Sequence, residues 1–152
     1  MKSLVSIILL SLILTNCGFK PIYSSKGSNF KVLDIKNKNE NKNSFFIEKV
    51  IMSLSNENAE KNIKLEIDYK KSITTILKDS KGDPSKKKLS VNVIIIVKNE
   101  RDNILVNQSF NEDFSYDIQS DKFEMTQYEE NITDNLNSKI TNDIIFLLGT
   151  LK

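Results

Sequence analysis

The chain of 152 residues contains no histidine and no tryptophan, and it has only one cysteine, two prolines and four glycines. The absence of histidine removes the side chain that most often acts as a base near neutral pH and as a metal ligand. Serines are numerous, but no histidine is present to activate one as a nucleophile. No D-x-D-x-D-G calcium loop occurs either. These absences predict a protein that is not an enzyme and holds no metal or cofactor.

A strong excess of either charge is also absent, because 22 lysines and arginines face 20 acidic residues and leave a formal net charge of +2. Proteins that bind nucleic acid rely on neutralising many phosphates. We therefore expect no nucleic-acid partner. The pair Glu129-Glu130 is expected only to solvate a helix, because neighbouring helical side chains project about 100° apart.

The one long apolar run lies near the first residue. Lys2 precedes an almost unbroken series of Val, Ile and Leu from Leu4 to Leu14, and Leu14-Thr15-Asn16-Cys17 follows. A short positive region, an apolar core and a cleavage-like end are the layout of an export signal. A helix that crosses a bilayer needs about 20 apolar residues. We therefore predict that residues 1–16 are a signal peptide that is removed.

The only cysteine, Cys17, lies where the signal would be cut. The pattern resembles a bacterial lipobox, in which the cysteine carries acyl chains on its sulfur and its amine. Asn16 departs from the Gly, Ala or Ser that is usual before the cysteine. The alternative is an ordinary secretory signal with an incidental cysteine. A lone exported thiol needs its own explanation, and lipidation provides one. A triacylated residue would exceed the two membrane signals that stable anchoring takes. We therefore predict lipidation at Cys17, a tether over residues 17–29 and a single domain over 30–152.

Hydrophobic periodicity predicts the first elements of that domain. Phe30 to Ile35 suggests a strand, and the polar run from Lys36 to Asn43 suggests a loop. Ser44 is expected to cap a helix, because apolar residues from Phe46 to Leu54 recur at steps of three and four.

Strict alternation then predicts three long strands separated by polar turns. The first is expected to be half-buried along its whole length and to end in a turn from Lys78 to Lys88. On the second, Ile94 and Ile96 add apolar groups to the face opposite the main stripe. The strands are expected over 63–77, 89–97 and 104–116.

A final helix is predicted from the capping box Thr126-x-x-Glu129 to about Leu148, with Gly149 ending it. Its apolar residues step by four from Ile132. The order strand, helix, three strands, helix predicts an α+β two-layer sandwich, with two helices packed on one face of a four-stranded, mostly antiparallel sheet.

The segment Cys17-Gly18-Phe19-Lys20-Pro21-Ile22-Tyr23 resembles the start of the lipopolysaccharide (LPS)-assembly lipoprotein family, LptE. Phe114-Ser115-Tyr116 and Tyr128-Glu129-Glu130 support the likeness. The resemblance implies two helices on a four-stranded sheet. It also implies an outer-membrane lipoprotein on the periplasmic side, since Gly18 is not the Asp that retains lipoproteins in the inner membrane. Such a protein helps to assemble and plugs a β-barrel LPS translocon, LptD-like, and binds LPS for delivery to the outer leaflet.

Two candidate contact sites follow. Lysines cluster around the first predicted hairpin, and Lys86, Lys87 and Lys88 are the best candidates for binding LPS phosphates, since clustered ammonium groups attract phosphate. The alternative is a solvated turn. Ile94 and Ile96 are candidates for contact with the barrel, or for cover by the segment from Phe19 to Tyr23.

Two other functions remain open from the sequence. One is an auxiliary lipoprotein of another envelope lipid transporter. The other is a lipid-anchored hydrolase acting on envelope polymers, which a deep cleft with two convergent carboxylates would favour.

Overall fold

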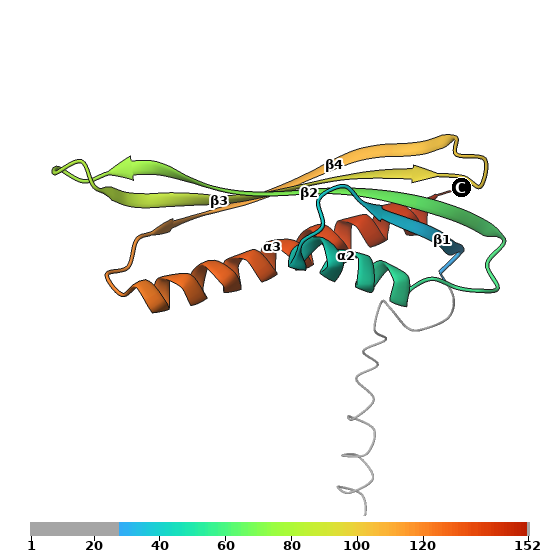
Figure 1. Ribbon diagram of the computed structural model, residues 1–152, viewed down its shortest axis with the longest axis horizontal. Coiled ribbons are helices and arrows are strands. Elements are labelled where there is room, and N and C mark those ends of the chain that lie inside the picture. Colours follow the sequence, from blue (N-terminus) through green and yellow to red (C-terminus); the bar gives the residue numbers. More distant parts are fainter. Residues whose placement is uncertain (1–27, 152) are drawn as a thin grey trace, which may run out of the picture.

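The computed structural model describes residues 28–151, so the predicted signal peptide, Cys17 and the segment from Phe19 to Tyr23 lie outside the described residues. Four strands form one sheet, and two helices pack on one of its faces (Figure 1). The predicted α+β order is confirmed. The elements are β1 (Phe30–Asn37), α2 (Lys42–Ser53), β2 (Lys61–Lys78), β3 (Pro84–Lys98), β4 (Ile104–Asp117) and α3 (Lys122–Thr150).

The spatial order of the strands is the order of the sequence, β1-β2-β3-β4. β2, β3 and β4 form an antiparallel meander, whereas β1 runs parallel to β2. The parallel pair is possible because α2 provides the crossover between the two strands. The sheet is therefore mixed, with a single parallel pair at one edge.

The core lies between the helices and the sheet face that carries the alternating apolar residues. On β2 this face presents Ile63, Leu65, Ile67 and Tyr69, all at most 4% exposed. The predicted stripe on α3 is confirmed, since Ile140, Ile144 and Leu148 are fully buried and Ile132 and Leu136 are nearly so. Neither helix of the described range is long and apolar enough to cross a bilayer.

The helix boundaries differ from the predicted ones. Asn41, not Ser44, is the N-cap of α2: its side chain accepts hydrogen bonds from the N–H groups of Asn43 and Ser44, while Ser44 Oγ accepts one from the N–H of Asn41. Ser44 is thus the reciprocal partner within a capping box. Asp121, not Thr126, is the N-cap of α3, and its side chain accepts hydrogen bonds from the N–H groups of Phe123 and Glu124. Gly149 lies inside α3, because the helix continues to Thr150 and ends at Leu151.

The second half of β2 was predicted to be half-buried, but it is exposed from Lys70 onward. β1 pairs with β2 only as far as Ile67, so neither β1 nor α2 extends over that half. A β-bulge at Ile76 brings Leu77 opposite Lys86, which places Leu77 on the face away from the helices. Strict alternation over 63–77 predicts Leu77 on the same face as Ile63 and Tyr69, and that prediction was wrong.

The predicted turn from Lys78 to Lys88 was also too long. The connection spans only residues 79–83, where Asp79 Oδ1 accepts hydrogen bonds from the N–H groups of Lys81 and Asp83 and Gly82 has φ +90°. β3 begins at Pro84, so the lysines predicted to lie in a turn lie in a strand.

Candidate functional site

The strongest charge concentration is the distal hairpin, which we define as residues 70–88 at the joined ends of β2 and β3. It carries seven lysines and two aspartates, a net charge of +5. Figure 1 shows that its tip reaches beyond the first turn of α3. The side chains from Lys70 to Pro84 are exposed, because only the first turns of α3 reach this part of the sheet.

The three lysines predicted as an LPS site lie here, but they do not share a face. Lys87 points toward the helices, where its Nζ lies 3.5 Å from Glu129 Oε1. Lys86 and Lys88 point to the opposite face by strand alternation. Lys86 lies 3.8 Å from Asp117 on β4, and Lys88 has no ion-pair partner among residues 28–151. The predicted trio is therefore divided into an outward pair and one inward residue.

Glu129 has a structural role that the sequence did not indicate. Its carboxylate accepts a hydrogen bond from the hydroxyl of Tyr116 over 2.6 Å as well as the contact from Lys87. The Tyr116 ring is buried and meets Tyr128 edge to face at 5.9 Å. Burial, and then the neighbouring carboxylate, raise the pKa of Tyr116. Glu129 thus holds β3 and β4 to α3, which corrects the prediction that it only solvates the helix.

A further inward cation is Lys71. Its Nζ donates to Thr133 Oγ1 over 2.9 Å, and Thr133 in turn donates to the carbonyl of Glu129. The sequence pattern gives no signal for this residue, because a lysine at an inward position only interrupts the alternation of apolar residues in a strand. Both inward cations of the hairpin are bonded to α3, so the outward face carries the more available charge.

Large apolar side chains are exposed beside these cations. Ile76 and Leu77, at the bulge opposite the outward Lys86, are 47% and 58% exposed. Ile73 and Phe114 are also exposed, but both pair with the buried Leu89 and lie on the face toward the helices. A surface that combines ammonium groups with exposed apolar carbon suits an amphiphile that has both phosphate and hydrocarbon.

Ile94 and Ile96 lie on the sheet face away from the helices, as predicted. Ile94 is opposite Asp68 and Ser109, and Ile96 is opposite Glu66 and Asn107. Their surroundings are polar: Lys98 forms an ion pair with Glu66, and this bond lowers the pKa of Glu66. No helix covers this face in the described part of the chain (Figure 1). The two isoleucines are therefore half-buried apolar residues within a polar sheet surface.

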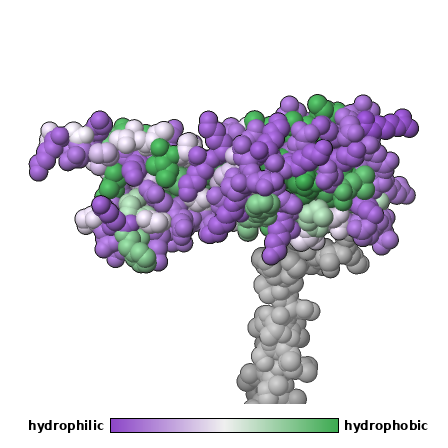
Figure 2. Space-filling model, in the orientation of Figure 1, coloured by the Kyte–Doolittle hydropathy of each residue, from purple (hydrophilic) through white to green (hydrophobic). Residues whose placement is uncertain are grey.

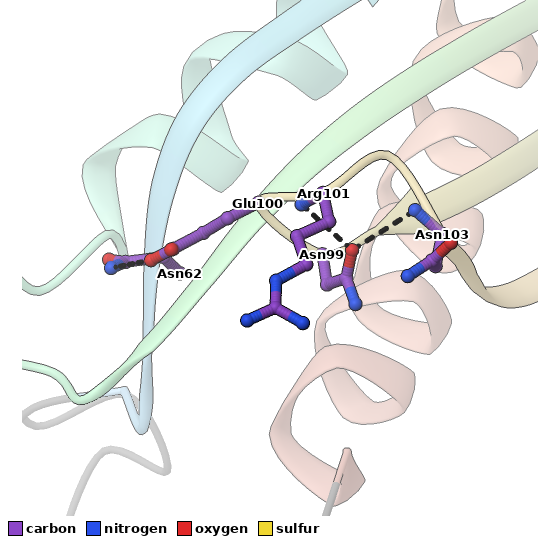
Figure 3. A pocket seen from close by; sticks show the side chains of 5 residues that line it. All are labelled: Asn62, Asn99, Glu100, Arg101 and Asn103. Carbon is purple, nitrogen blue, oxygen red and sulfur yellow. Dashed lines mark hydrogen bonds between the residues drawn. The ribbon is translucent and has the colours of Figure 1, made fainter.

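A shallow pocket lies at the turn between β3 and β4 (Figure 3). Asn99 Oδ1 accepts hydrogen bonds from the N–H groups of Arg101 and Asn103 at 2.9 and 3.0 Å, and Glu100 accepts one from Asn62. These bonds stabilise the turn, in which Asp102 has φ 63°. Across residues 28–151 no three Cys, Asp or Glu side chains are grouped to hold a metal ion. All five lining residues are polar or charged, so the pocket lacks the apolar side chains that line most small-molecule sites.

The geometry defines a class of fold: a four-stranded mixed sheet with a short and a long helix on one face and a projecting hairpin. No protein-family model matches the sequence, and no curated protein matches it either.

Solved structures do match this fold. Rare lipoprotein B from Shewanella oneidensis has a TM-score of 0.62 at 10% identity, over 79% of this chain and 95% of that chain. A minor lipoprotein from Acinetobacter baumannii has 0.61 at 13%, over 78% and 90%. Uncharacterized lipoprotein B from Nitrosomonas europaea has 0.59 at 12%, over 79% and 84%. At such low identity the likeness concerns the fold.

Proposed function

We propose that this chain is an outer-membrane lipoprotein of the LPS-assembly kind. Acyl chains on Cys17 hold it on the periplasmic side, where it assists the assembly of an LptD-like β-barrel translocon and plugs it. It binds LPS for delivery to the outer leaflet and catalyses no reaction. The observation that carries the proposal is the combination, in one chain, of the segment from Cys17 to Tyr23 with a fold similar to three solved lipoproteins.

The distal hairpin supports the LPS part of the proposal. Its outward lysines, Lys86 and Lys88, can approach phosphate groups, while Leu77 and Ile76 offer apolar carbon beside them. Ammonium groups act toward phosphate as flexible point charges. Lys87 is expected to contribute less, because Glu129 already neutralises it.

The sheet face away from the helices supports the proposed contact with a barrel. Ile94 and Ile96 are the apolar residues at its centre, and their neighbours are asparagine, serine and paired charges. A barrel wall with a few apolar contacts and many polar ones would complement this surface.

The test is a pull-down of the tagged full-length protein from detergent-solubilised outer membranes, with Cys17→Ala and Ile94→Ser/Ile96→Ser beside it. We expect one large barrel to co-purify in about equal amount, and we expect the amount of barrel recovered to be lower with the Ile94→Ser/Ile96→Ser variant. Phe123→Ser is the matched control, because Phe123 is exposed at the start of α3, far from that face.

The other outcomes separate the rival functions. Recovery with a different, soluble partner would indicate an auxiliary lipoprotein of another transporter. Recovery of the protein without any partner, but with lipid on Cys17, would support the lipid anchor and contradict the barrel partner. Recovery without lipid would contradict the proposal from its first step.

A further inference from the structure

The outward face of α2 is apolar and basic, although it contacts no other element of the described chain. Phe45, Phe46 and Met52 are 49%, 44% and 47% exposed. Three large apolar side chains on one side of a helix of 12 residues exceed the single exposed residues that are normal on a soluble surface. Figure 2 shows hydrophobic side chains at the surface in the region of α2.

The charges on this face are positive. Lys42 and Lys49 are exposed between the apolar residues, whereas the one acid of the helix, Glu48, turns aside to accept a hydrogen bond from Asn37. The outward face of α3 differs, because it carries Glu124, Glu130, Asp134 and Asp143 against Lys122 and Lys139. An anionic surface would therefore attract α2 and repel α3.

The chain also leaves the domain beside α2. Ser28, the first described residue, donates a hydrogen bond to the carbonyl of Leu54 at the C-terminal end of this helix. The step from Cys17 to Ser28 is eleven residues long. An extended chain of that length reaches about 36–40 Å. A helix of 12 residues is about 18 Å long. A lipid on Cys17 would therefore keep α2 within reach of the membrane surface.

We propose that the face formed by Lys42, Phe45, Phe46, Lys49 and Met52 docks on the surface of the bilayer to which the domain is anchored. The aromatic and Met side chains enter the boundary between headgroups and acyl chains, and the lysine side chains extend to lipid phosphates. The inference rests on the anchor of the proposed function, but neither the barrel nor LPS takes part in it.

The chain has no tryptophan, so Phe45→Trp places a single tryptophan on this face, whose emission can be excited apart from that of the tyrosines. Purified lipidated Phe45→Trp is reconstituted in vesicles of phosphatidylethanolamine and phosphatidylglycerol, with and without brominated acyl chains. We expect a blue-shifted emission that the brominated lipid quenches about twofold, as for a side chain at the interface. Phe123→Trp, which is 71% exposed at the far end of the domain, is the matched control and should be quenched little.

Adding Lys42→Glu/Lys49→Glu to Phe45→Trp should abolish the quenching, and Lys42→Arg/Lys49→Arg should retain it. Circular dichroism and the melting temperature verify that these variants fold. Equal quenching at positions 45 and 123, or none at either, would overturn the proposal. So would a shift at position 45 that appears only when a barrel is added, which would indicate a protein contact. Mass spectrometry reports the lipid on Cys17 separately, so loss of the anchor is distinguished from loss of the α2 contact.

Discussion

The hydroxyl of Tyr69 donates a hydrogen bond to Asn137 Oδ1 over 3.0 Å in the interior of the domain. The two residues are 4% and 1% exposed. Asn137 Nδ2 then donates to Asn43 Oδ1 over 3.1 Å. A single amide therefore joins the sheet, α3 and the first turn of α2, beside the last buried residue of β2.

Tyr69→Phe should destabilise the fold. The ring is kept, but the carbonyl oxygen of a buried amide loses its partner, which costs about 1–2 kcal/mol. Urea unfolding measured at neutral pH would test this. Tyr128→Phe is the control, because no hydrogen bond of its hydroxyl is present in the described structure and its ring contact with Tyr116 is preserved. Equal stability of the two variants would contradict the structural role of the amide.

The domain should lose stability in alkali. Burial raises the pKa of Tyr69 from 10.0 to about 12, and it raises the pKa of Tyr116 as well. Above pH 10 the unfolded state therefore releases its protons first, so stability is complete below pH 10 and falls as pH rises toward 12. The slope is at most about 1.4 kcal/mol per pH unit for each tyrosine. Unfolding free energies at pH 9 and pH 11 should differ less in Tyr69→Phe than in the parent protein.

Glu129→Ala should destabilise the fold more than Glu130→Ala does. It removes the acceptor of the buried Tyr116 hydroxyl and the partner of Lys87, a loss of about 2 kcal/mol for bonds to a charged group. Glu130→Ala, at an exposed position, should change stability by less than about 0.5 kcal/mol. Thermal melting of the two variants compares them directly, and a similar loss in both would contradict the anchoring role of Glu129.

Substitution by alanine should lower the stability of the domain at one glycine and raise it at another. Gly82 has φ +90°, so Gly82→Ala should cost about 1 kcal/mol in backbone strain, although nothing lies within 4 Å of the added carbon. Gly149 lies within α3 with open space around it, so Gly149→Ala should stabilise by about 0.5–1 kcal/mol. Chemical denaturation measures both. A gain at Gly82 would show that the turn does not need its left-handed residue.

The division of the lysines predicts unequal effects on LPS binding. Lys86→Ala/Lys88→Ala removes the outward pair and should weaken binding to LPS about tenfold, the size expected for charge-assisted contacts. Lys87→Ala should affect binding less and stability more, because it leaves Glu129 without its cation. Fluorescence titration with LPS measures the affinity. An equal loss for both variants would contradict this division, and a larger loss for Lys87→Ala would place the ligand on the inward face instead.

The elements and their order were predictable because long periodic segments carry a strong signal. Ile63 to Tyr69 alternates and α3 repeats every four residues, and both patterns are present in the fold. The caps were misplaced because Asn41 and Asp121 lie outside the apolar periodicity, where the prediction looked for them next to the first apolar residue.

The site was less predictable, because it depends on register. Lysines 86 to 88 are adjacent in sequence, but strand alternation sends Lys87 to the opposite side from its neighbours. The bulge at Ile76 moves Leu77 to the opposite face of the sheet, and the residue types there do not indicate a bulge. The structural role of the Glu129 carboxylate could not be predicted without the strand register, which places its two partners, Lys87 and Tyr116, directly opposite each other.

The parallel edge strand sets an order of events during folding. β2, β3 and β4 are sequential neighbours, so each hairpin can form as soon as its second strand has been synthesised. The start of β1 differs, because Asn29 Nδ2 lies 3.5 Å from the carbonyl oxygens of Gly149 and Leu151, 120 and 122 positions later. Lys61 Nζ also donates to Leu151. The end of the domain beside the proposed tether therefore emerges early in synthesis but closes last, when the final turn of α3 arrives.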